Sequence, residues 1–221
     1  MNNVLVMAPH PDDETLGCGG TLLKHKASGD QLHWLIFTDM TRSNLYSDEA
    51  KSKRIQEIEE VAARYEFSSV SQLHYPPAQL DHLPKSNLVK EVSDIVQLIQ
   101  PQVIYLPYRN DVHSDHEVVF DICVAATKQF RLPCVNELLA YETISETDFS
   151  LKPNTMFNPN YFVDINEYLQ EKLDIVSIYA SELGEFPFPR SLEAIEAMAK
   201  YRGVQANSKA AEAFMLLKKV C

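Results

Sequence analysis

Two short segments of the chain combine histidines and carboxylates at spacings that suit a metal ion. The first, HPDDE, spans residues 10–14, and the second, HSDH, spans residues 113–116. His10 and Asp13 lie three residues apart, so both can face one cation, whose charge would relieve the repulsion between neighbouring carboxylates. His113 and His116 have the same spacing, in what reads as the first turn of a helix, so both imidazoles can point into one cleft. Together the segments supply histidine, carboxylate and histidine, the three-ligand pattern of a catalytic zinc site with an open fourth position.

The acids of the first segment have two other interpretations. Asp12 and Glu14 could be acids of a helix N-terminus, where each favours the helix dipole by roughly 0.3–1 kcal/mol, but this leaves His10 without a role. A dinucleotide site would explain the glycines that follow, Gly17, Gly19 and Gly20. It would also explain Asp39, an acid about twenty residues further on. That fingerprint needs its glycines directly after the strand, where this chain has PHPDD. We therefore expect the glycines to allow close packing of a helix on a sheet.

Apolar strand candidates alternate with helical stretches along the chain. Strands are expected at residues 3–7, 32–38, 70–75, 103–106, 138–143 and 161–165, and helices at about 14–28, 48–65, 88–99, 113–130, 166–181 and 192–206. This order predicts the α/β fold class, as a Rossmann-like three-layer sandwich with a mostly parallel sheet and helices on both faces. We expect one domain over residues 1–221. Both metal-binding segments follow expected strands, at the carboxyl ends where open α/β sheets bind ligands.

The composition narrows the classes of partner. The chain has 20 Lys and Arg against 31 Asp and Glu, a net charge of −11, and no stretch concentrates basic residues, so nucleic acid is not an expected partner. Its longest apolar runs, such as residues 34–37, are far shorter than the roughly 18 residues that would span a bilayer. The first residues also lack the basic flank of a signal peptide, so we expect no membrane span and a cytoplasmic location. A homo-oligomer is compatible with the sequence.

The other cysteines and histidines carry no recognisable site pattern. Without a CxxC pair they indicate neither a disulfide framework nor a thiolate zinc site, and we expect buried thiols at Cys18, Cys123, Cys134 and Cys221. The histidines outside the two segments are interpreted as ordinary surface or core residues: His25, His33, His74 and His82.

The paired segments resemble the two signatures of a known enzyme family. HPDDE with LGCGG at residues 16–20, followed by HSDH, is similar in order and spacing to the signatures of the LmbE-like, or PIG-L, zinc-dependent N-acetyl-sugar deacetylases. Later pieces agree as well, PRSL at 189–192, YRG at 201–203 and AEAF at 211–214, so the resemblance covers nearly the whole chain. It implies a small-molecule N-acetylated sugar as substrate and Zn²⁺, or another divalent transition metal, as cofactor.

The resemblance also implies a role for each signature residue. The metal ligands would be a histidine from each segment and the second aspartate of the pair: His10, Asp13 and His116. Asp12 would be the general base that takes a proton from the attacking water and later protonates the departing amine. A protonated His113 would stabilise the oxyanion, and Asp115 would orient His113.

Two arginines are candidates for substrate binding. Arg54 resembles a family arginine that approaches the sugar or an attached anion. Some relatives that act on N-acetylglucosaminyl-malate carry an arginine directly before the second signature, where it would pair with a carboxylate, whereas this chain has Val112. Arg109 would replace that arginine only if the loop turned differently. We therefore expect a sugar destined for a cell-surface glycan, a nucleotide-linked sugar or another amino-sugar metabolite to be preferred over the malate conjugate.

Two other function classes stay open beside the leading hypothesis of a metal-dependent N-deacetylase. A non-catalytic protein of the same fold would bind metal and sugar, but it would need neither Asp12 nor His113. A phosphoryl-handling protein would use Asp12 and Asp13 as an acidic magnesium pocket, which leaves the histidines idle because magnesium prefers oxygen ligands. Metal analysis and the release of amine from N-acetylglucosamine derivatives would distinguish the three.

Overall fold

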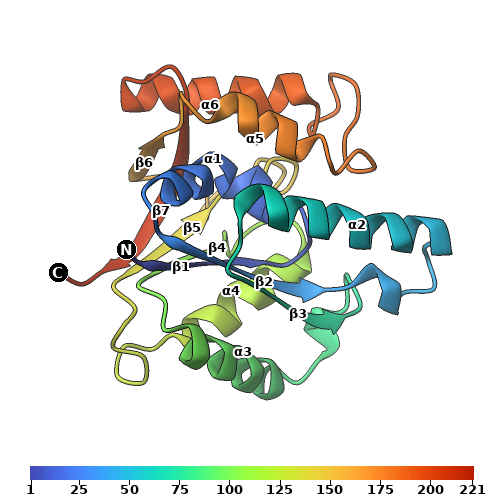
Figure 1. Ribbon diagram of the computed structural model, residues 1–221, viewed down its shortest axis with the longest axis vertical. Coiled ribbons are helices and arrows are strands. Elements are labelled where there is room, and N and C mark those ends of the chain that lie inside the picture. The colour runs from blue at the N-terminus through green and yellow to red at the C-terminus, as the bar shows by residue number, and fades with distance from the viewer.

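The computed structural model describes residues 1–221, and all of its strands belong to one sheet (Figure 1). The strands are β1 (Asn3–Ala8), β2 (Gln31–Thr38), β3 (Ser69–Tyr75), β4 (Val103–Pro107), β5 (Glu137–Tyr141), β6 (Tyr161–Asp164) and β7 (Ala211–Lys219). They lie side by side in the order β3-β2-β1-β4-β5-β7-β6. The helices are α1 (Asp13–Ala27), α2 (Asp48–Tyr65), α3 (Lys85–Ile99), α4 (Ser114–Ala126), α5 (Leu169–Val176) and α6 (Leu192–Ala206), with short 3-10 helices η1 (Met40–Arg42) and η2 (Leu80–His82).

One strand, β7, runs against its neighbours. Strands β1 to β5 pair in parallel, whereas β7 pairs antiparallel with both β5 and β6. This strand is missing from the sequence-based expectation, because its residues, AEAFMLLKK, favour helix by intrinsic propensity. Burial of Ala211, Ala213 and Phe214 within the sheet overrides that preference.

The side chains of β1 divide between two cores, one on each face of the sheet. Leu5 and Met7 pack with residues of α3 and α4, while Val4 and Val6 pack with residues of α1, α2 and α5. Figure 1 shows α3 and α4 on one side of the sheet and the other four helices on the opposite side. The three-layer α/β sandwich expected from the alternation of strands and helices is therefore confirmed.

Helix α1 approaches the sheet closely because glycines remove side chains from the contact. A Cβ atom on Gly17 would overlap the ring of Tyr141 in β5, and one on Gly20 would lie 2.7 Å from Ile165. These contacts confirm that the glycines after the first signature serve packing.

Two helices end earlier than expected. Helix α4 ends at Ala126 and not near residue 130, and α5 ends at Val176 and not near residue 181. After α5 the chain continues as tight turns, in which the amides of Tyr179 and Glu182 bond to carbonyls three residues back. These turns carry the side chains of Tyr179 and Glu182 to the start of α1, where they contact Glu14 and Arg54.

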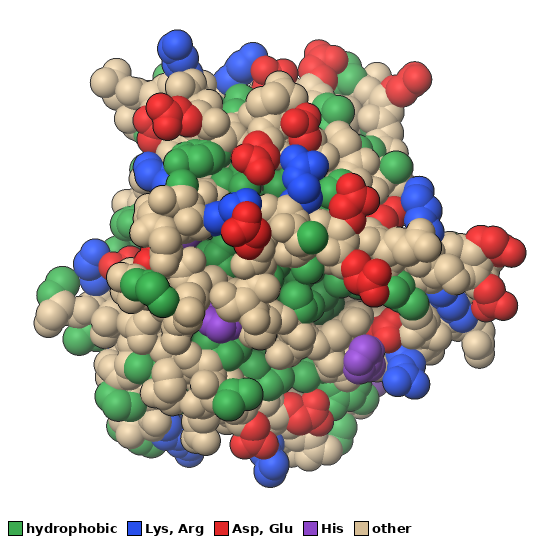
Figure 2. Space-filling model, in the orientation of Figure 1, with side chains coloured by type: hydrophobic (Ala, Val, Ile, Leu, Met, Phe, Trp, Pro, Cys, Tyr) green, Lys and Arg blue, Asp and Glu red, His purple; other side chains and the backbone are tan.

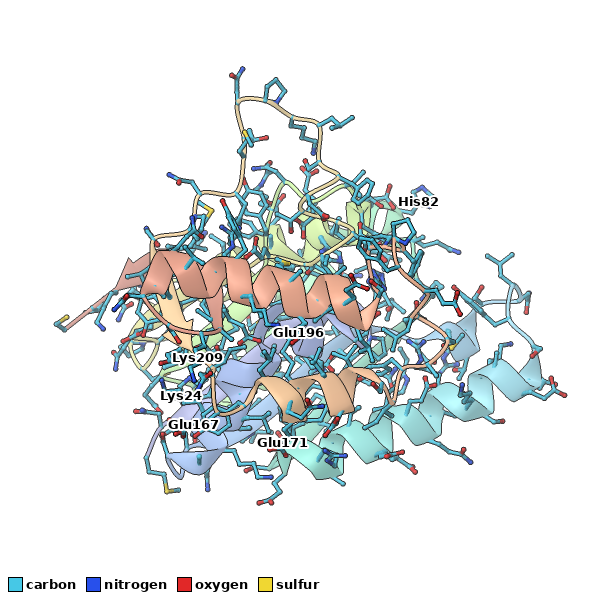
Figure 3. The ribbon with its side chains drawn as sticks, turned by 90° about the horizontal axis from the view of Figure 1, so that it is seen from above. Lys24, His82, Glu167, Glu171, Glu196 and Lys209 are labelled. Atoms are coloured by element: carbon cyan, nitrogen blue, oxygen red, sulfur yellow. The ribbon has the colours of Figure 1, made fainter.

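The surface carries scattered charges of both signs. Figure 2 shows Lys and Arg side chains interspersed with Asp and Glu on the visible face, without a continuous basic patch. Seen from above, Lys24 of α1, Glu171 of α5 and Glu196 of α6 belong to the helical layer on that side of the sheet (Figure 3). The helices include none with the length and apolar character needed to cross a membrane.

The four cysteines are all free, but they are not all buried. Cys18 and Cys123 lie in the two cores, as expected. Cys134 is half-buried and Cys221 is exposed, so the expectation of buried thiols is wrong for these two. Both lie outside the regular elements, before β5 and after β7, where the layers do not cover them.

Candidate metal centre and substrate cavity

The two signatures meet at the carboxyl edge of the parallel part of the sheet. Strands β1 and β4 are hydrogen-bonded neighbours, so the segments that follow them come side by side. The rings of His10, His113 and His116 consequently lie with their centroids 4.5 to 5.6 Å apart. Residues separated by more than a hundred positions thus form one cluster.

His10, Asp13 and His116 offer a set of ligand atoms that fits a transition metal. Asp13 Oδ2 lies 3.2 Å from Nδ1 of His10 and 3.4 Å from Nε2 of His116. Burial opposes the charge on Asp13, but His116 and His10 outweigh it and hold the pKa of this carboxyl well below its usual range. The other oxygen, Asp13 Oδ1, is buried and has no hydrogen-bond partner in the protein. A carboxylate that contacts two imidazoles through one oxygen and leaves the other buried without a partner is what a bound cation would satisfy.

A second possible ligand set, His10, His113 and Asp115, fits less well. Its ligand atoms also lie within 4.8 Å of one another. However, the Asp115 oxygens already accept hydrogen bonds from the amides of Ala78 and Leu80, at 2.7 and 3.1 Å. The carboxylate of Asp115 therefore has less need of a cation than that of Asp13.

Each histidine of the first set has a carboxylate on its other ring nitrogen. Asp115 Oδ2 lies 3.1 Å from Nε2 of His10, and Asp111 Oδ2 lies 2.8 Å from Nδ1 of His116. Such outer carboxylates orient imidazoles toward a metal and raise their basicity. The Asp115 carboxylate contacts His10, whereas the Asp115 backbone N–H donates to His113, so the expectation that Asp115 orients His113 stays a prediction. Asp111 was missed, although it lies five residues before His116, just ahead of the second segment.

His113 uses one ring nitrogen to cap the helix that follows it. It is the N-cap of α4, and its Nδ1 accepts the backbone N–H of Asp115 at 3.2 Å. Because that nitrogen is an acceptor, the proton of a neutral ring sits on Nε2. Burial lowers the pKa of His113 to about 4, with His10 and His116 adding to the shift. Protonation of His113 during the reaction stays a prediction, which this burial opposes; a neutral ring still presents an N–H.

Asp12 has an unusual backbone that Glu14 supports. The φ angle of Asp12 is 143°, a conformation that residues with a side chain rarely adopt. Its N–H donates to Glu14 Oε2 at 3.0 Å, and Glu14 Oε1 accepts from the hydroxyls of Thr15 and Tyr179 at 2.6 and 3.0 Å. Glu14 is fully buried, which raises its pKa to about 8. Glu14 therefore supports the turn that presents Asp12. This role is separate from the favourable interaction of an acid with the helix dipole.

Arg190 lies against the carboxylate of Asp12. Its Nη1 lies 2.7 Å from Asp12 Oδ2, its Nε donates to the hydroxyl of Ser145 at 2.8 Å, and its Nη2 lies 3.3 Å from Glu146. Burial raises the pKa of Asp12 to about 7, although the Arg190 guanidinium opposes that rise. Arg190 was not expected at the site, yet it belongs to the PRSL piece that resembles the family.

A break in α1 is bridged by a buried ion pair. Cys18 has non-helical backbone angles, which interrupt the hydrogen bonds of the helix. Lys172 donates to the carbonyl of Leu16 at 2.9 Å, and Glu212 of β7 accepts the amides of Gly20 and Thr21 at 2.9 and 2.7 Å. Lys172 and Glu212 also pair with each other at 2.6 Å. The backbone groups freed by the break are thus satisfied, and the turn that carries Asp13 is fixed on the sheet.

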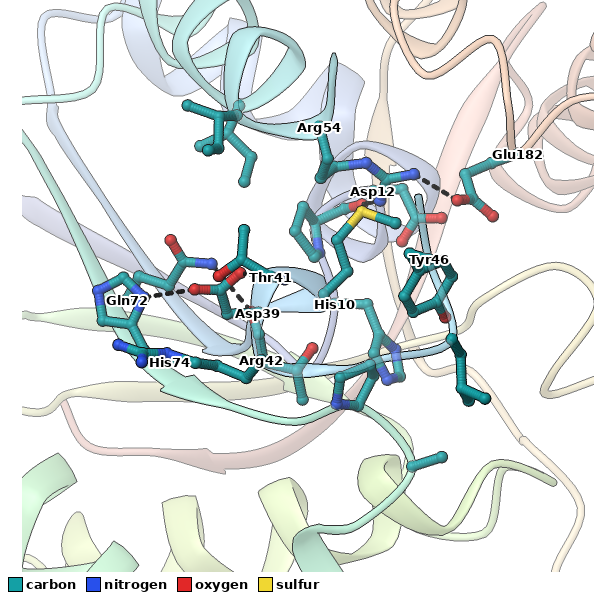
Figure 4. Close-up of a pocket in the computed structure, with 18 of the residues that line it drawn as sticks. His10, Asp12, Asp39, Thr41, Arg42, Tyr46, Arg54, Gln72, His74 and Glu182 are labelled. Carbon is teal, nitrogen blue, oxygen red and sulfur yellow. Dashed lines mark hydrogen bonds and ion pairs between the residues drawn. The ribbon is translucent and has the colours of Figure 1, made fainter. Parts of the chain in front are cut away.

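A cavity of about 630 Å³ opens from the histidine cluster toward the ends of β2 and β3, within the range of ligand sites. The lining residues labelled in Figure 4 fall into two groups, Asp12, Arg54 and Glu182 on one side of His10 and Asp39, Arg42, Gln72 and His74 on the other. His74, interpreted from the sequence as an ordinary histidine, lines this cavity. No spacing in the sequence links it to either signature.

Arg54 lines the cavity, but the N–H groups of its guanidinium already donate to other groups of the protein. It bonds to Glu57 at 2.8 Å, to the carbonyl of Pro11 at 3.0 Å and to Glu182. Pro11 lies directly before Asp12, so Arg54 fixes the wall on which the first signature sits. Its expected contact with substrate stays a prediction.

Arg109 does not reach the cavity. Its Nε lies 2.8 Å from Asp121 and its Nη2 lies 3.1 Å from Glu117, both on α4. Val112 is 57% exposed and, like Arg109, does not line the cavity. These two ion pairs hold Arg109 against α4, and its expected contact with substrate stays a prediction.

The chain is similar to known proteins over most of their length. The chain is 26% identical over 230 residues to a diacetylchitobiose deacetylase of Thermococcus kodakarensis, covering 96% of this chain and 82% of the relative. The crystal structure of a conserved protein from Thermus thermophilus matches with 27% identity and a TM-score of 0.80, over 100% of this chain and 97% of that one. An N,N′-diacetylchitobiose deacetylase from Pyrococcus horikoshii has the same fold, with 21% identity, a TM-score of 0.78 and coverage of 98% and 84%.

A family model also matches the region that forms the site. The model described as PIG-L, GlcNAc-PI de-N-acetylase, matches residues 5–127, which include both signatures. It spans β1 to β4 and the helices that carry Asp13 and His116. On this match, and on the cluster that the two signatures form, the chain belongs to the PIG-L family.

Proposed function

We propose that this protein is a metal-dependent hydrolase that removes the N-acetyl group from an N-acetylated amino sugar of the N-acetylglucosamine type. One observation carries the proposal: the buried carboxylate of Asp13 contacts two imidazoles through Oδ2 and keeps Oδ1 unpartnered, and it adjoins Asp12, which lines a cavity of ligand size. The family and the diacetylchitobiose deacetylase relative support the same reaction class.

His10, Asp13 and His116 would hold the metal. Two imidazoles and one carboxylate suit zinc better than magnesium, which prefers oxygen ligands. When bound, such an ion supplies a Lewis acid that makes water more acidic and polarises the acetyl carbonyl. Asp115 and Asp111 keep the rings of His10 and His116 turned toward this position.

Asp12 moves the protons. Its carboxylate lines the cavity and takes one proton from the water whose oxygen attacks the acetyl carbon. When the C–N bond breaks, the same carboxyl returns that proton to the amine nitrogen, so acetate and a free amine are released. Arg190 holds the carboxylate in place through its contact with Asp12 Oδ2.

His113 stabilises the negative charge on the carbonyl oxygen. The Asp115 amide fixes Nδ1 as an acceptor, so Nε2–H is available as a donor, and His113 lines the cavity. Fixed donors aimed at a developing oxyanion stabilise it strongly where water is excluded. A neutral imidazole is sufficient for this role.

Two further features support a catalytic role over simple binding. A protein that only bound metal and sugar would need neither the buried Asp12 nor the N–H of His113. The structure of the sheet also supports residues 1–221 as a single deacetylase domain, because β7 inserts between β5 and β6 and contacts α1 through Glu212.

A chelation experiment with a substrate panel tests the proposal. Free amine is measured from N-acetylglucosamine, N,N′-diacetylchitobiose and other N-acetylglucosaminyl conjugates, before and after treatment with a chelator and after adding back Zn²⁺. We expect activity to disappear on chelation and to return with Zn²⁺, because three protein ligands leave an exchangeable position. Full activity of the metal-stripped protein would refute metal dependence, and no amine from any conjugate would refute the deacetylase.

A further inference from the structure

The proposed chemistry uses only one end of the cavity. The roles assigned above stop at the histidine cluster, Asp12 and the residues that hold them. At the other end, the segments that follow β2 and end β3 contribute polar side chains without an assigned task, among them Asp39, Arg42, Gln72 and His74 (Figure 4).

A bulge in β3 directs His74 to this end. Ile36 pairs with Gln72, but Thr38 pairs with Tyr75, so β3 contains one extra residue there. His74 lies in this bulge with φ of 57°, the left-handed region that favours glycine. Its Nδ1 lies 2.8 Å from Asp39 Oδ2, while 51% of its side chain stays exposed. The protein thus holds a histidine in an unfavourable backbone conformation with its ring at the cavity wall.

These four side chains present both hydrogen-bond donors and acceptors to the cavity. Asp39 accepts the N–H of Thr41 at 2.7 Å as well as the His74 ring, and Gln72 donates to the carbonyl of Thr38 at 3.0 Å. With its Nδ1–H given to Asp39, a neutral His74 offers Nε2 as an acceptor. Gln72 Oε1 is a second acceptor without a protein partner, and the guanidinium of Arg42 is a donor with no ion pair.

The charges around the cavity favour a neutral ligand. Four carboxylates and three arginines line it, and the guanidinium groups of Arg54 and Arg190 are paired with carboxylates. An anionic group near Arg42 would also meet the carboxylate of Asp39. Burial raises the pKa of Asp39, but the bonds from Thr41 and His74 outweigh it and hold that pKa below its usual range.

Apolar side chains that line the same cavity complete a surface suited to a sugar. Met40, Leu45, Tyr46 and Ile55 line the same cavity. A sugar ring has apolar C–H faces and hydroxyl edges, so it can pack on these side chains while its hydroxyls reach the polar atoms. A phosphate or carboxylate would use only the donors.

We propose that Asp39, Gln72 and His74 form a subsite that binds the hydroxyl groups of an uncharged sugar portion of the substrate, remote from the acetamido group. The inference rests on the proposed deacetylase and narrows its substrates to neutral glycosides. We therefore expect neutral glycosides to be better substrates than nucleotide-linked, phosphorylated or malate-linked sugars. Asp39 acts by positioning His74, and His74 and Gln72 contact the ligand.

Substitution of His74 by glycine gives a direct test, because glycine fits a φ of 57° without strain. We expect His74→Gly to raise KM for N,N′-diacetylchitobiose by about three- to tenfold, with kcat within about twofold of wild type and no fall in Tm. KM for the anionic N-acetylglucosamine 6-phosphate should be higher than for the disaccharide in wild type. His82→Ala, which removes an exposed histidine outside the cavity, is the matched control and should change neither constant.

A binding measurement separates this inference from the proposed reaction. N,N′-Diacetylchitobiose is titrated by calorimetry into Asp12→Asn protein, with and without His74→Gly, and we expect the second substitution to weaken Kd by about three- to tenfold. If the wild-type protein binds the disaccharide without turnover and His74→Gly weakens that binding, the deacetylase is rejected and the subsite is kept. Turnover with KM and Kd unchanged by His74→Gly, or a preference for the phosphorylated sugar, would reject the subsite and keep the deacetylase.

Discussion

The two ends of the cavity differ in how their polar atoms are satisfied. At the end formed by the signatures, other protein groups hold most of the polar atoms, but not Asp13 Oδ1, the atom left for the metal: Asp115 accepts two amides and contacts the His10 ring, and Glu14 accepts an amide and two hydroxyls. At the end formed by β2 and β3, His74 and Gln72 each keep one atom free to face the cavity. The first arrangement fixes geometry before substrate arrives, as bond-breaking requires, and the second leaves hydrogen bonds for the ligand.

This difference predicts different kinetic effects of mutation. Changes at the signature end should remove metal or lower kcat, because they disturb groups that act in the transition state. Changes at the β2–β3 end should raise KM with kcat nearly unchanged, because they remove contacts made equally in the ground state and the transition state.

The largest effect is expected from His116→Ala. It removes one of three proposed ligands and leaves Asp111 and Asp13 without their shared imidazole partner. We expect loss of bound metal after dialysis and turnover near background, measured by elemental analysis and amine release. Retention of one equivalent of metal by this variant would show that the ligand set is different.

Asp12→Asn should separate proton transfer from metal binding. The amide has the shape of the carboxylate but cannot accept the proton, so kcat should fall by about 10²- to 10⁴-fold while the metal content stays at the wild-type level. Elemental analysis and kinetics on the same sample check both. If this variant lost metal as readily as His116→Ala, the division of roles between Asp12 and Asp13 would be wrong.

Glu14→Ala should produce a smaller loss. It removes the acceptor of the Asp12 N–H and leaves a backbone with φ of 143° unsupported, so Asp12 should shift and kcat should fall by roughly 10- to 100-fold. Metal content should not change.

Glu14→Gln is the matched control for that loss. Its amide oxygen can still accept the Asp12 N–H, and burial already favours a neutral group by raising the pKa of Glu14 to about 8. Most of the wild-type kcat should therefore be retained. Equal losses in both variants would mean that Glu14 acts through its charge and not through the turn.

The smallest effect is expected from Asp39→Asn. It weakens the bond that positions His74 but keeps an oxygen for the N–H of Thr41, so KM should rise about threefold with kcat unchanged. Steady-state kinetics on N,N′-diacetylchitobiose measure this. A tenfold fall in kcat would instead show that the β2–β3 end of the cavity takes part in catalysis, and the two ends would then not differ in function.

The fold and the histidine cluster were predictable because their signals are local. Alternating strands and helices define the layers, and each signature directly follows a strand, so the sheet must bring His10 near His116. Strand β7 was not predictable in this way. Its residues favour a helix, and only the space between β5 and β6 makes them a strand.

The partners of the signature residues come from distant parts of the chain. Arg190 lies 178 residues from Asp12, and the Asp39–His74 contact depends on a bulge that no residue pattern marked. Spacing also could not show that the Asp115 carboxylate holds His10, because the two residues lie 105 positions apart in the chain. Such contacts follow from the packed structure and not from the order of residues.

The break in α1 has a consequence for the assembly of the protein on the ribosome. Strand β1 and helix α1 emerge first, whereas Glu212, which accepts the amides of Gly20 and Thr21, lies in the last strand to be made. The helix that carries Asp13 therefore gains its final hydrogen bonds only after β7 has been synthesised and has docked between β5 and β6. A nascent chain arrested before residue 211 would already contain HPDDE and HSDH, yet its first helix would still lack the clamp that fixes it to the sheet.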